Sequence, residues 1–232
     1  MVTNALFTTL REGGLHKTLC LKEFKGFTLA EVLITLVIIG VIAAMTIPTL
    51  INKTNNHEYI SRLKKAYSTM AQATNRIIAE EGNPRADIGG WATSSEAIFN
   101  MYKKYLNNAK ICGLDTGCFE GAYRRMDNKL EQYDSGRYTL VIADGTEISM
   151  RDAEFDNSCS KNTIGSYNTC QIILIDVNGA KGPNAVGRDT FAFTLKENGF
   201  FPAGCDAATA CVNITHGWDC TCNALREGAI NY

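Results

Sequence analysis

The longest apolar run of the chain lies near its N-terminus. The 21 residues from Phe27 to Ile47 include a single charged side chain, that of Glu31. A helix rises about 1.5 Å per residue, so this run is long enough to span about 30 Å, the hydrocarbon thickness of a bilayer. A carboxylate inside lipid costs about 2.5–3.5 kcal/mol unless it finds a partner. The run therefore predicts a transmembrane helix in which Glu31 has a functional role.

A helical pattern continues after this run. Apolar residues recur at spacings of three and four and form one stripe, made up of Tyr59, Leu63, Ala66, Met70, Ala73 and Ile77. The sequence Gly82-Asn83-Pro84 predicts that the helix ends at Glu81. We therefore expect a stem helix over residues 27–81, transmembrane over 27–47 and amphipathic over 48–81. Its outer stripe is expected to pack on the protein's own head.

The remaining residues, 82–232, predict one globular head. A helix is expected from an N-cap at Ser94 or Ser95 to about Leu106, with Ile98, Met101, Tyr102 and Tyr105 on its inner side. We expect β structure from Arg137 onwards, opening with a hairpin across Asp144-Gly145-Thr146. Later elements are expected as strands at 171–177 and 190–195, a turn at 197–199 and a short helix at 218–226. The pattern favours an α+β fold with a single antiparallel sheet.

The most specific motif lies at the start of the apolar run. It reads Lys25-Gly26-Phe27-Thr28-Leu29-Ala30-Glu31-Val32-Leu33-Ile34. A secretory signal peptide carries its small-residue cleavage site after a shorter apolar core, whereas Gly26 precedes this run. The motif resembles the prepilin peptidase site of type IV pilins and of the pseudopilins of type II secretion. An uncleaved signal anchor is the alternative, but such an anchor has no need of this motif.

The resemblance implies a maturation step and an assembly step. Prepilin peptidase would remove residues 1–26 by cutting after Gly26, and Phe27 would then be N-methylated. Glu31, fifth in the mature chain, would contact the N-terminal amine of a neighbouring subunit during assembly on an inner-membrane platform. Gly40 and Pro48 lie where the family has helix-loosening residues. The implied fold is a pilin-like lollipop, with a long N-terminal helix packed on a C-terminal antiparallel sheet.

The implied function is that of a structural subunit of a type IV pilus or a type II secretion pseudopilus, assembled with other pilin or pseudopilin subunits into a helical filament. A second hypothesis is a monomeric periplasmic binding protein anchored in the inner membrane. An enzyme is not expected, because the sequence has no Gly-x-Ser-x-Gly elbow, phosphate loop or His-Glu-x-x-His motif, and its three histidines are scattered.

Charge predicts the orientation of the chain. The leader carries four basic and two acidic residues: Arg11, Lys17, Lys22, Lys25, Glu12 and Glu23. The positive-inside rule then keeps the N-terminus in the cytoplasm and places the head in the periplasm, from where it would enter a filament or reach the cell surface. Taking these six residues from the 23 basic and 24 acidic residues of the chain leaves a net charge of −3. Nucleic acid is therefore not an expected partner.

The cysteines agree with export. One of the nine, Cys20, lies in the leader. The others form an even set that suits an oxidising compartment: Cys112, Cys118, Cys159, Cys170, Cys205, Cys211, Cys220 and Cys222. Proximity favours pairing of Cys112 with Cys118 and of Cys159 with Cys170. Cys220 and Cys222 are too close to bond each other comfortably, so we expect them to reach Cys205 and Cys211 in an order that the sequence leaves open.

A segment rich in oxygen ligands and glycine runs from Asp176 to Asp189. Carboxylate, amide and backbone oxygens are what a hard cation such as calcium binds. The segment resembles a loop of pilin-like proteins, and secretion pseudopilins place calcium in a comparable region. The candidate ligands are Asp176, Asn178, Asn184 and Asp189. The alternative is a long turn held by Asx side chains and Pro183 without any ion.

Overall fold

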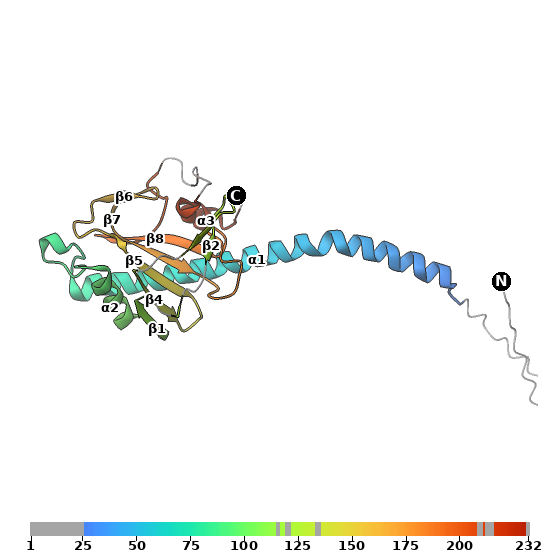
Figure 1. Cartoon of the computed structure of the whole chain (residues 1–232), viewed down its shortest axis with the longest axis horizontal. Coiled ribbons are helices and arrows are strands. Elements are labelled where there is room, and N and C mark those ends of the chain that lie inside the picture. The colour runs from blue at the N-terminus through green and yellow to red at the C-terminus, as the bar shows by residue number, and fades with distance from the viewer. Residues whose placement is uncertain are drawn as a thin grey trace, which may run out of the picture. The chain divides into compact units, whose positions relative to one another are not determined.

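The computed structural model describes residues 26–114, 117–118, 122–132, 136–207, 211 and 216–230 of the 232-residue chain. Residues 1–25 of the expected leader lie outside the described residues. The chain divides into two compact units, residues 1–48 and residues 49–232. Figure 1 shows the helices and strands of both units.

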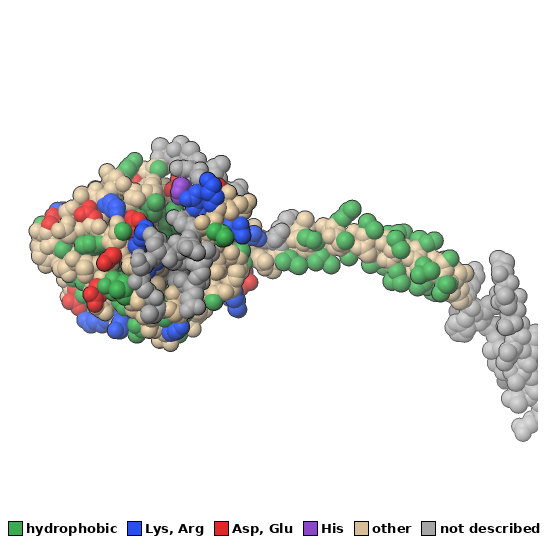
Figure 2. All heavy atoms as spheres, in the orientation of Figure 1, with side chains coloured by type: hydrophobic (Ala, Val, Ile, Leu, Met, Phe, Trp, Pro, Cys, Tyr) green, Lys and Arg blue, Asp and Glu red, His purple; other side chains and the backbone are tan. Residues whose placement is uncertain are grey.

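Helix α1, Leu29–Glu81, begins in the first unit and runs through Pro48 into the second. Its end at Glu81 is the predicted one, and its start lies two residues after Phe27. The large apolar side chains from Phe27 to Ile51 are exposed, and Figure 2 shows them along the helix. Among the described residues, α1 is the one helix long and apolar enough to cross a membrane. Exposed apolar surface on this scale favours burial in lipid.

Among the described residues, the second unit is built on a seven-stranded antiparallel sheet. The strand order is β1-β4-β5-β7-β8-β9, and β6 pairs with β7. The bounds are β1 Asn108–Leu114, β4 Arg137–Ile142, β5 Glu147–Phe155, β6 Lys161–Thr163, β7 Ser166–Asp176, β8 Thr190–Lys196 and β9 Gly199–Pro202. Strands β2 Ala122–Arg124 and β3 Leu130–Gln132 form a separate pair. A long N-terminal helix followed by an antiparallel sheet confirms the expected α+β fold.

One face of the sheet packs on the outer half of α1. All six residues of the predicted stripe are buried, with Leu63, Met70 and Ile77 fully inaccessible. They share one core with Ile173 of β7 and Phe193 of β8, and Tyr67 stacks on Phe193 with ring centroids 5.9 Å apart. The expectation that the stripe packs on the protein's own head is therefore confirmed.

Successive side chains of β7 contribute to two different hydrophobic cores. Ile173 and Ile175 join the core under α1, whereas Ile172 and Leu174 belong to a smaller cluster with Tyr123. Successive side chains of a strand point to opposite faces, so the sheet is covered on both sides. This explains why β7 is apolar without interruption from Ile172 to Ile175.

Short helices complete the second unit. Helix α2, Ser95–Tyr105, begins as predicted, and the Ser94 hydroxyl accepts the Ala97 N–H at 3.0 Å. It buries Ile98, Phe99 and Tyr102, while the expected inner residues Met101 and Tyr105 are only partly buried. Two 3-10 turns occupy Ala86–Ile88 (η1) and Trp218–Cys220 (η2), and helix α3, Thr221–Glu227, follows η2. Gly228 closes α3 at φ +65°, as predicted.

The expectation that β structure begins at Arg137 is wrong, because β1 precedes it and pairs with β4. β1 lies at an edge of the sheet, contains two register shifts and is largely exposed. Its sequence Asn-Ala-Lys-Ile-Cys-Gly-Leu lacks the alternation by which strands are predicted, and Ile111 is its one β-branched residue. The separate β2–β3 pair also adds a second sheet to the single one expected.

Four disulfides close loops of the second unit. Cys112 bonds Cys118 and Cys159 bonds Cys170, the two pairs that proximity favours. The order left open for the other four cysteines is Cys205 with Cys222 and Cys211 with Cys220. Helix α3 and the turn before it are thereby tied to the segment that follows β9.

The buried stripe predicts the effect of a core truncation. Leu63→Ala is expected to lower the free energy of unfolding of the second unit by about 2–5 kcal/mol, because it leaves a cavity under the sheet. The measurement is guanidinium unfolding of the full chain in micelles, followed by the fluorescence of Trp91 and Trp218. The exposed Ile88→Ala is the matched control, with an expected change below about 0.5 kcal/mol. Equal losses in both variants would contradict the packing of the stripe.

Candidate functional site

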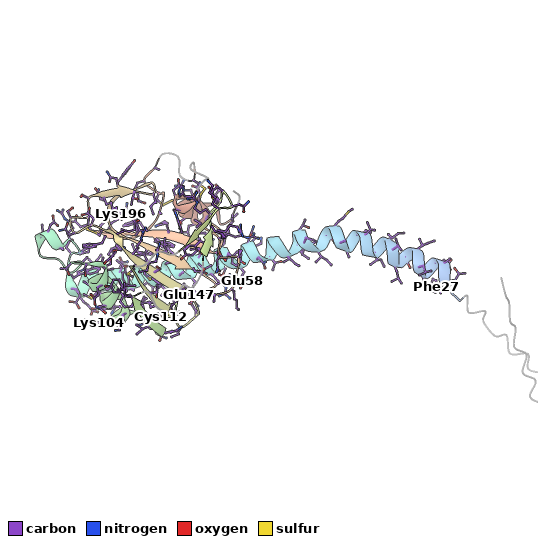
Figure 3. The ribbon with its side chains drawn as sticks, in the orientation of Figure 1. Phe27, Glu58, Lys104, Cys112, Glu147 and Lys196 are labelled. Atoms are coloured by element: carbon purple, nitrogen blue, oxygen red, sulfur yellow. A yellow bond between two sulfur atoms is a disulfide. The ribbon has the colours of Figure 1, made fainter. Side chains whose placement is uncertain are left out.

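The predicted processing junction lies immediately before α1. Gly26, Phe27 and Thr28 precede the helix, and Phe27 is 87% exposed (Figure 3). A Cβ placed on Gly26 would meet no atom within 4 Å. The bond between Gly26 and Phe27 is therefore reachable in this chain, as a peptidase would require.

Glu31 folds back onto the start of its own helix. Its carboxylate accepts the Thr28 N–H and the Thr28 hydroxyl, both at 2.9 Å, and the Glu31 N–H donates to the Thr28 hydroxyl at 3.3 Å. This reciprocal arrangement is a capping box, which satisfies N–H groups that the first turn of a helix leaves unpaired. Thr28 thus gives the carboxylate a partner within the same chain.

The prediction from sequence did not assign a capping role to Thr28. The signal for it is present, because Thr28-Leu29-Ala30-Glu31 has the Thr-x-x-Glu spacing of a capping box. The prediction instead paired Glu31 with an amine of a neighbouring subunit, and the single chain leaves that pairing a prediction.

The four candidate ligands of the 176–189 loop lie around the ends of two paired strands. Asp176 ends β7 and Asp189 immediately precedes β8, and Asp176 lies opposite Thr190 in the sheet. Both carboxylates are buried, with exposures of 3% and 0%. Asp189 accepts the N–H groups of Asn184 at 2.9 Å and Ala185 at 2.6 Å. Asp176 accepts the Asn178 N–H at 3.1 Å and the Thr190 hydroxyl at 3.2 Å.

The electrostatics of this loop favour positive charge. Burial, followed by the nearby Asp189 carboxylate, raises the pKa of Asp176 to about 8, and burial also raises the pKa of Asp189. The side-chain oxygens Oδ1 of Asn178 and Asn184 are buried and make no hydrogen bond to the described residues. Two carboxylates and two unpaired amide oxygens suit a hard cation such as calcium. The described residues contain no cluster of three or more His, Cys, Asp or Glu side chains, so backbone carbonyls or water would complete the coordination.

The loop also contacts the stem within the second unit. The Arg62 guanidinium donates to the Val177 carbonyl at 3.5 Å. Burial, followed by the Asp189 carboxylate, raises the pKa of Tyr59 on the same helix. The sequence pattern predicted Tyr59 only as a core residue and excluded Arg62 from the stripe.

Comparison with known proteins decides what the N-terminal junction is. Residues 21–47 match a family model described as the prokaryotic N-terminal methylation motif. The chain carries the N-terminal motif of type IV pilins and pseudopilins. No curated protein and no solved structure matches the chain significantly.

The methylation motif supports a broad class for the protein. It supports a pilin-like secreted subunit that prepilin peptidase processes, held in a membrane by its apolar helix. Pilins are structural proteins rather than enzymes. Gly40 and Pro48 lie inside the continuous α1, and their helix-loosening role remains a prediction. The physical basis of that prediction for Gly40 is that a glycine costs about 1 kcal/mol in a helix interior relative to alanine.

The capping box predicts a measurable role for Thr28. Thr28→Ala removes the hydroxyl that caps α1 and is expected to cost about 1 kcal/mol in the first turn. Hydrogen exchange of the Glu31 amide, measured by NMR on the full chain in micelles, should accelerate about fivefold. Thr28→Ser keeps the hydroxyl and should retain the wild-type exchange rate. Equal exchange in the alanine variant and the wild type would contradict the cap.

Proposed function

We propose that the protein is a structural subunit of a type IV pilus or of a type II secretion pseudopilus. Prepilin peptidase cuts it after Gly26, Phe27 is N-methylated, and the mature chains assemble into a helical filament on an inner-membrane platform. The observation that carries this proposal is the methylation motif at residues 21–47, which joins a reachable Gly26–Phe27 bond to a carboxylate at the start of an apolar helix.

In this mechanism Glu31 exchanges one partner for another. In the separate subunit the Thr28 N–H and hydroxyl satisfy the carboxylate. Cleavage creates a positively charged amine on Phe27, and the amine of one subunit reaches Glu31 of its neighbour. A hydrogen bond between two ionised groups is about twice as strong as a neutral one, and lipid strengthens it further. The capping box therefore holds the carboxylate until the neighbour's amine replaces it.

The same proposal assigns the location. The leader stays in the cytoplasm, residues 27–47 cross the inner membrane, and the disulfide-bonded residues 82–232 lie in the periplasm until the subunit joins the filament. The positive leader and the four disulfides support this orientation.

A pair of variants tests the proposal. Intact-mass analysis of the purified wild type should show methyl-Phe27 as the N-terminus. Glu31→Ala should be inserted, cut and methylated equally well but should leave filaments undetectable in a sheared fraction, because the amine then lacks its carboxylate. Thr35→Ala, one turn further along the helix, also removes a polar side chain and should assemble normally.

Two results would count against this function. An intact leader on the purified protein would exclude maturation, and normal filaments from Glu31→Ala would exclude the pairing of amine and carboxylate. Filaments released by shearing indicate a pilus, whereas loss of a secreted protein after gene deletion indicates a pseudopilus.

We also propose that Asp176, Asn178, Asn184 and Asp189 hold a calcium ion in the assembled subunit. The two buried carboxylates and the unpaired amide oxygens of the loop support this assignment. A bound cation would neutralise the carboxylates and fix the loop that contacts Arg62 of the stem.

Removal of calcium tests the assignment. Calcium at a hundred times its dissociation constant stabilises a protein by about 2.7 kcal/mol, and a chelator should therefore lower the Tm of the full chain in micelles by about 5–11 °C. Asp176→Asn and Asp189→Asn should abolish the response to chelator and calcium. The exposed Asp152→Asn should keep it. An unchanged wild-type Tm would favour the turn held by Asx side chains alone.

A further inference from the structure

The second unit contains a polar cavity far along the chain from the methylation motif. Its volume is about 920 Å³, within the range of about 300–1,000 Å³ that is usual for small-molecule sites. It lies where the segment after α1 meets the β5–β6 turn, the start of β7 and the β8–β9 turn, and Lys196 beside it is labelled in Figure 3. Its lining residues used below are Asn83, Arg85, Tyr167, Asn168, Lys196, Glu197, Asn198 and Asp206.

The walls of the cavity are held in place. Asp206 forms an ion pair with Lys196 and also accepts the Tyr167 N–H at 2.8 Å. The Asn83 amide donates to the Glu197 carboxylate at 2.7 Å. The Cys159–Cys170 disulfide fixes another part of the lining. A ligand would thus meet a preformed site, which lowers the entropy cost of binding.

The charges of the cavity cancel. Lys196 pairs with Asp206, and Arg85 lies 3.5 Å from Glu197 while also binding Asp87. The lining therefore contains two cations and two anions, each with an opposite charge beside it. The lining therefore has no net charge with which to attract an anionic or a cationic ligand, so its ligand is expected to be neutral.

Several polar side chains of this neutral site have hydrogen-bonding groups without a partner in the described part of the chain. The side-chain amides of Asn168 and Asn198 and the Tyr167 hydroxyl make no hydrogen bond within the described part of the chain. Each amide offers two donors and an acceptor, and the phenol offers one of each. The Tyr167 side chain is 51% exposed, so part of its ring is open to a ligand.

We propose that this cavity binds a neutral carbohydrate, with Tyr167 as the platform for a sugar ring and Asn168 and Asn198 as hydrogen-bonding partners of its hydroxyls. A sugar ring has an apolar C–H face that packs on an aromatic ring, while its rim of hydroxyls both donates and accepts. An apolar ligand would cover the side-chain amides of Asn168 and Asn198 without giving them hydrogen-bonding partners. The proposal does not depend on filament assembly.

Titration of the full chain with neutral trisaccharides tests the proposal. The protein is kept in a detergent without sugar, and the probes are cellotriose, maltotriose and chitotriose, followed by saturation-transfer NMR and calorimetry. At least one probe should bind. Tyr167→Ala should weaken its affinity about tenfold or more, because the ring contact is lost. Tyr167→Phe keeps the ring and should lose less, and Asn198→Ala should also weaken binding.

Leu130→Ala, which truncates an exposed side chain outside the cavity, serves as the control and should bind like the wild type. Circular dichroism and disulfide mapping establish that each variant is folded. Failure of all three trisaccharides would overturn the proposal, and so would binding that Tyr167→Ala leaves unchanged. Tighter binding of triglycine or sialyllactose than of the neutral trisaccharides to the same cavity would also overturn the proposal. Such a result would indicate a peptide or an anion as the ligand.

Discussion

The burial of the α1 stripe under the sheet is the contact on which the second unit depends. Leu63, Met70 and Ile77 are wholly inaccessible, and the aromatic stack of Tyr67 on Phe193 lies in the same core. Because the apolar run of the first unit belongs to the same unbroken helix, the segment suited to lipid and the central core helix are continuous in backbone. A change that weakens the outer half of α1 therefore acts on the fold itself.

Strong periodicity made this part of the fold predictable from sequence. The stripe on α1, the Asp144-Gly145 hairpin and the end of the stem at Glu81 all rest on local patterns that the tertiary structure follows. β1 escaped prediction because edge strands bury little and need no alternation. The pairing order of the last four cysteines is a property of three-dimensional proximity, which sequence spacing does not contain.

The candidate sites differ in how much of each could be predicted from the sequence. The residues of the methylation motif are contiguous, so the family could be inferred from them directly. The Thr-x-x-Glu spacing that indicates Thr28 as the capping partner is present in the sequence, but the prediction did not use it. Arg62 and Val177 are joined only by folding, as are the walls of the polar cavity, and no local pattern brings them together. The two carboxylate sites nevertheless share one feature. The carboxylates of Glu31 and Asp189 are each held by a backbone N–H donor from a residue nearby in sequence.

The disulfide arrangement near the C-terminus has a consequence for the durability of the protein. The Cys211–Cys220 bridge lies inside the loop that Cys205–Cys222 closes, so the two bonds are nested. A protease that cuts the backbone once between Cys205 and Cys222 releases nothing, because the two pieces stay joined through sulfur. Exposed turns are preferred sites of such cuts. A chain nicked in this loop would therefore keep its α3 segment.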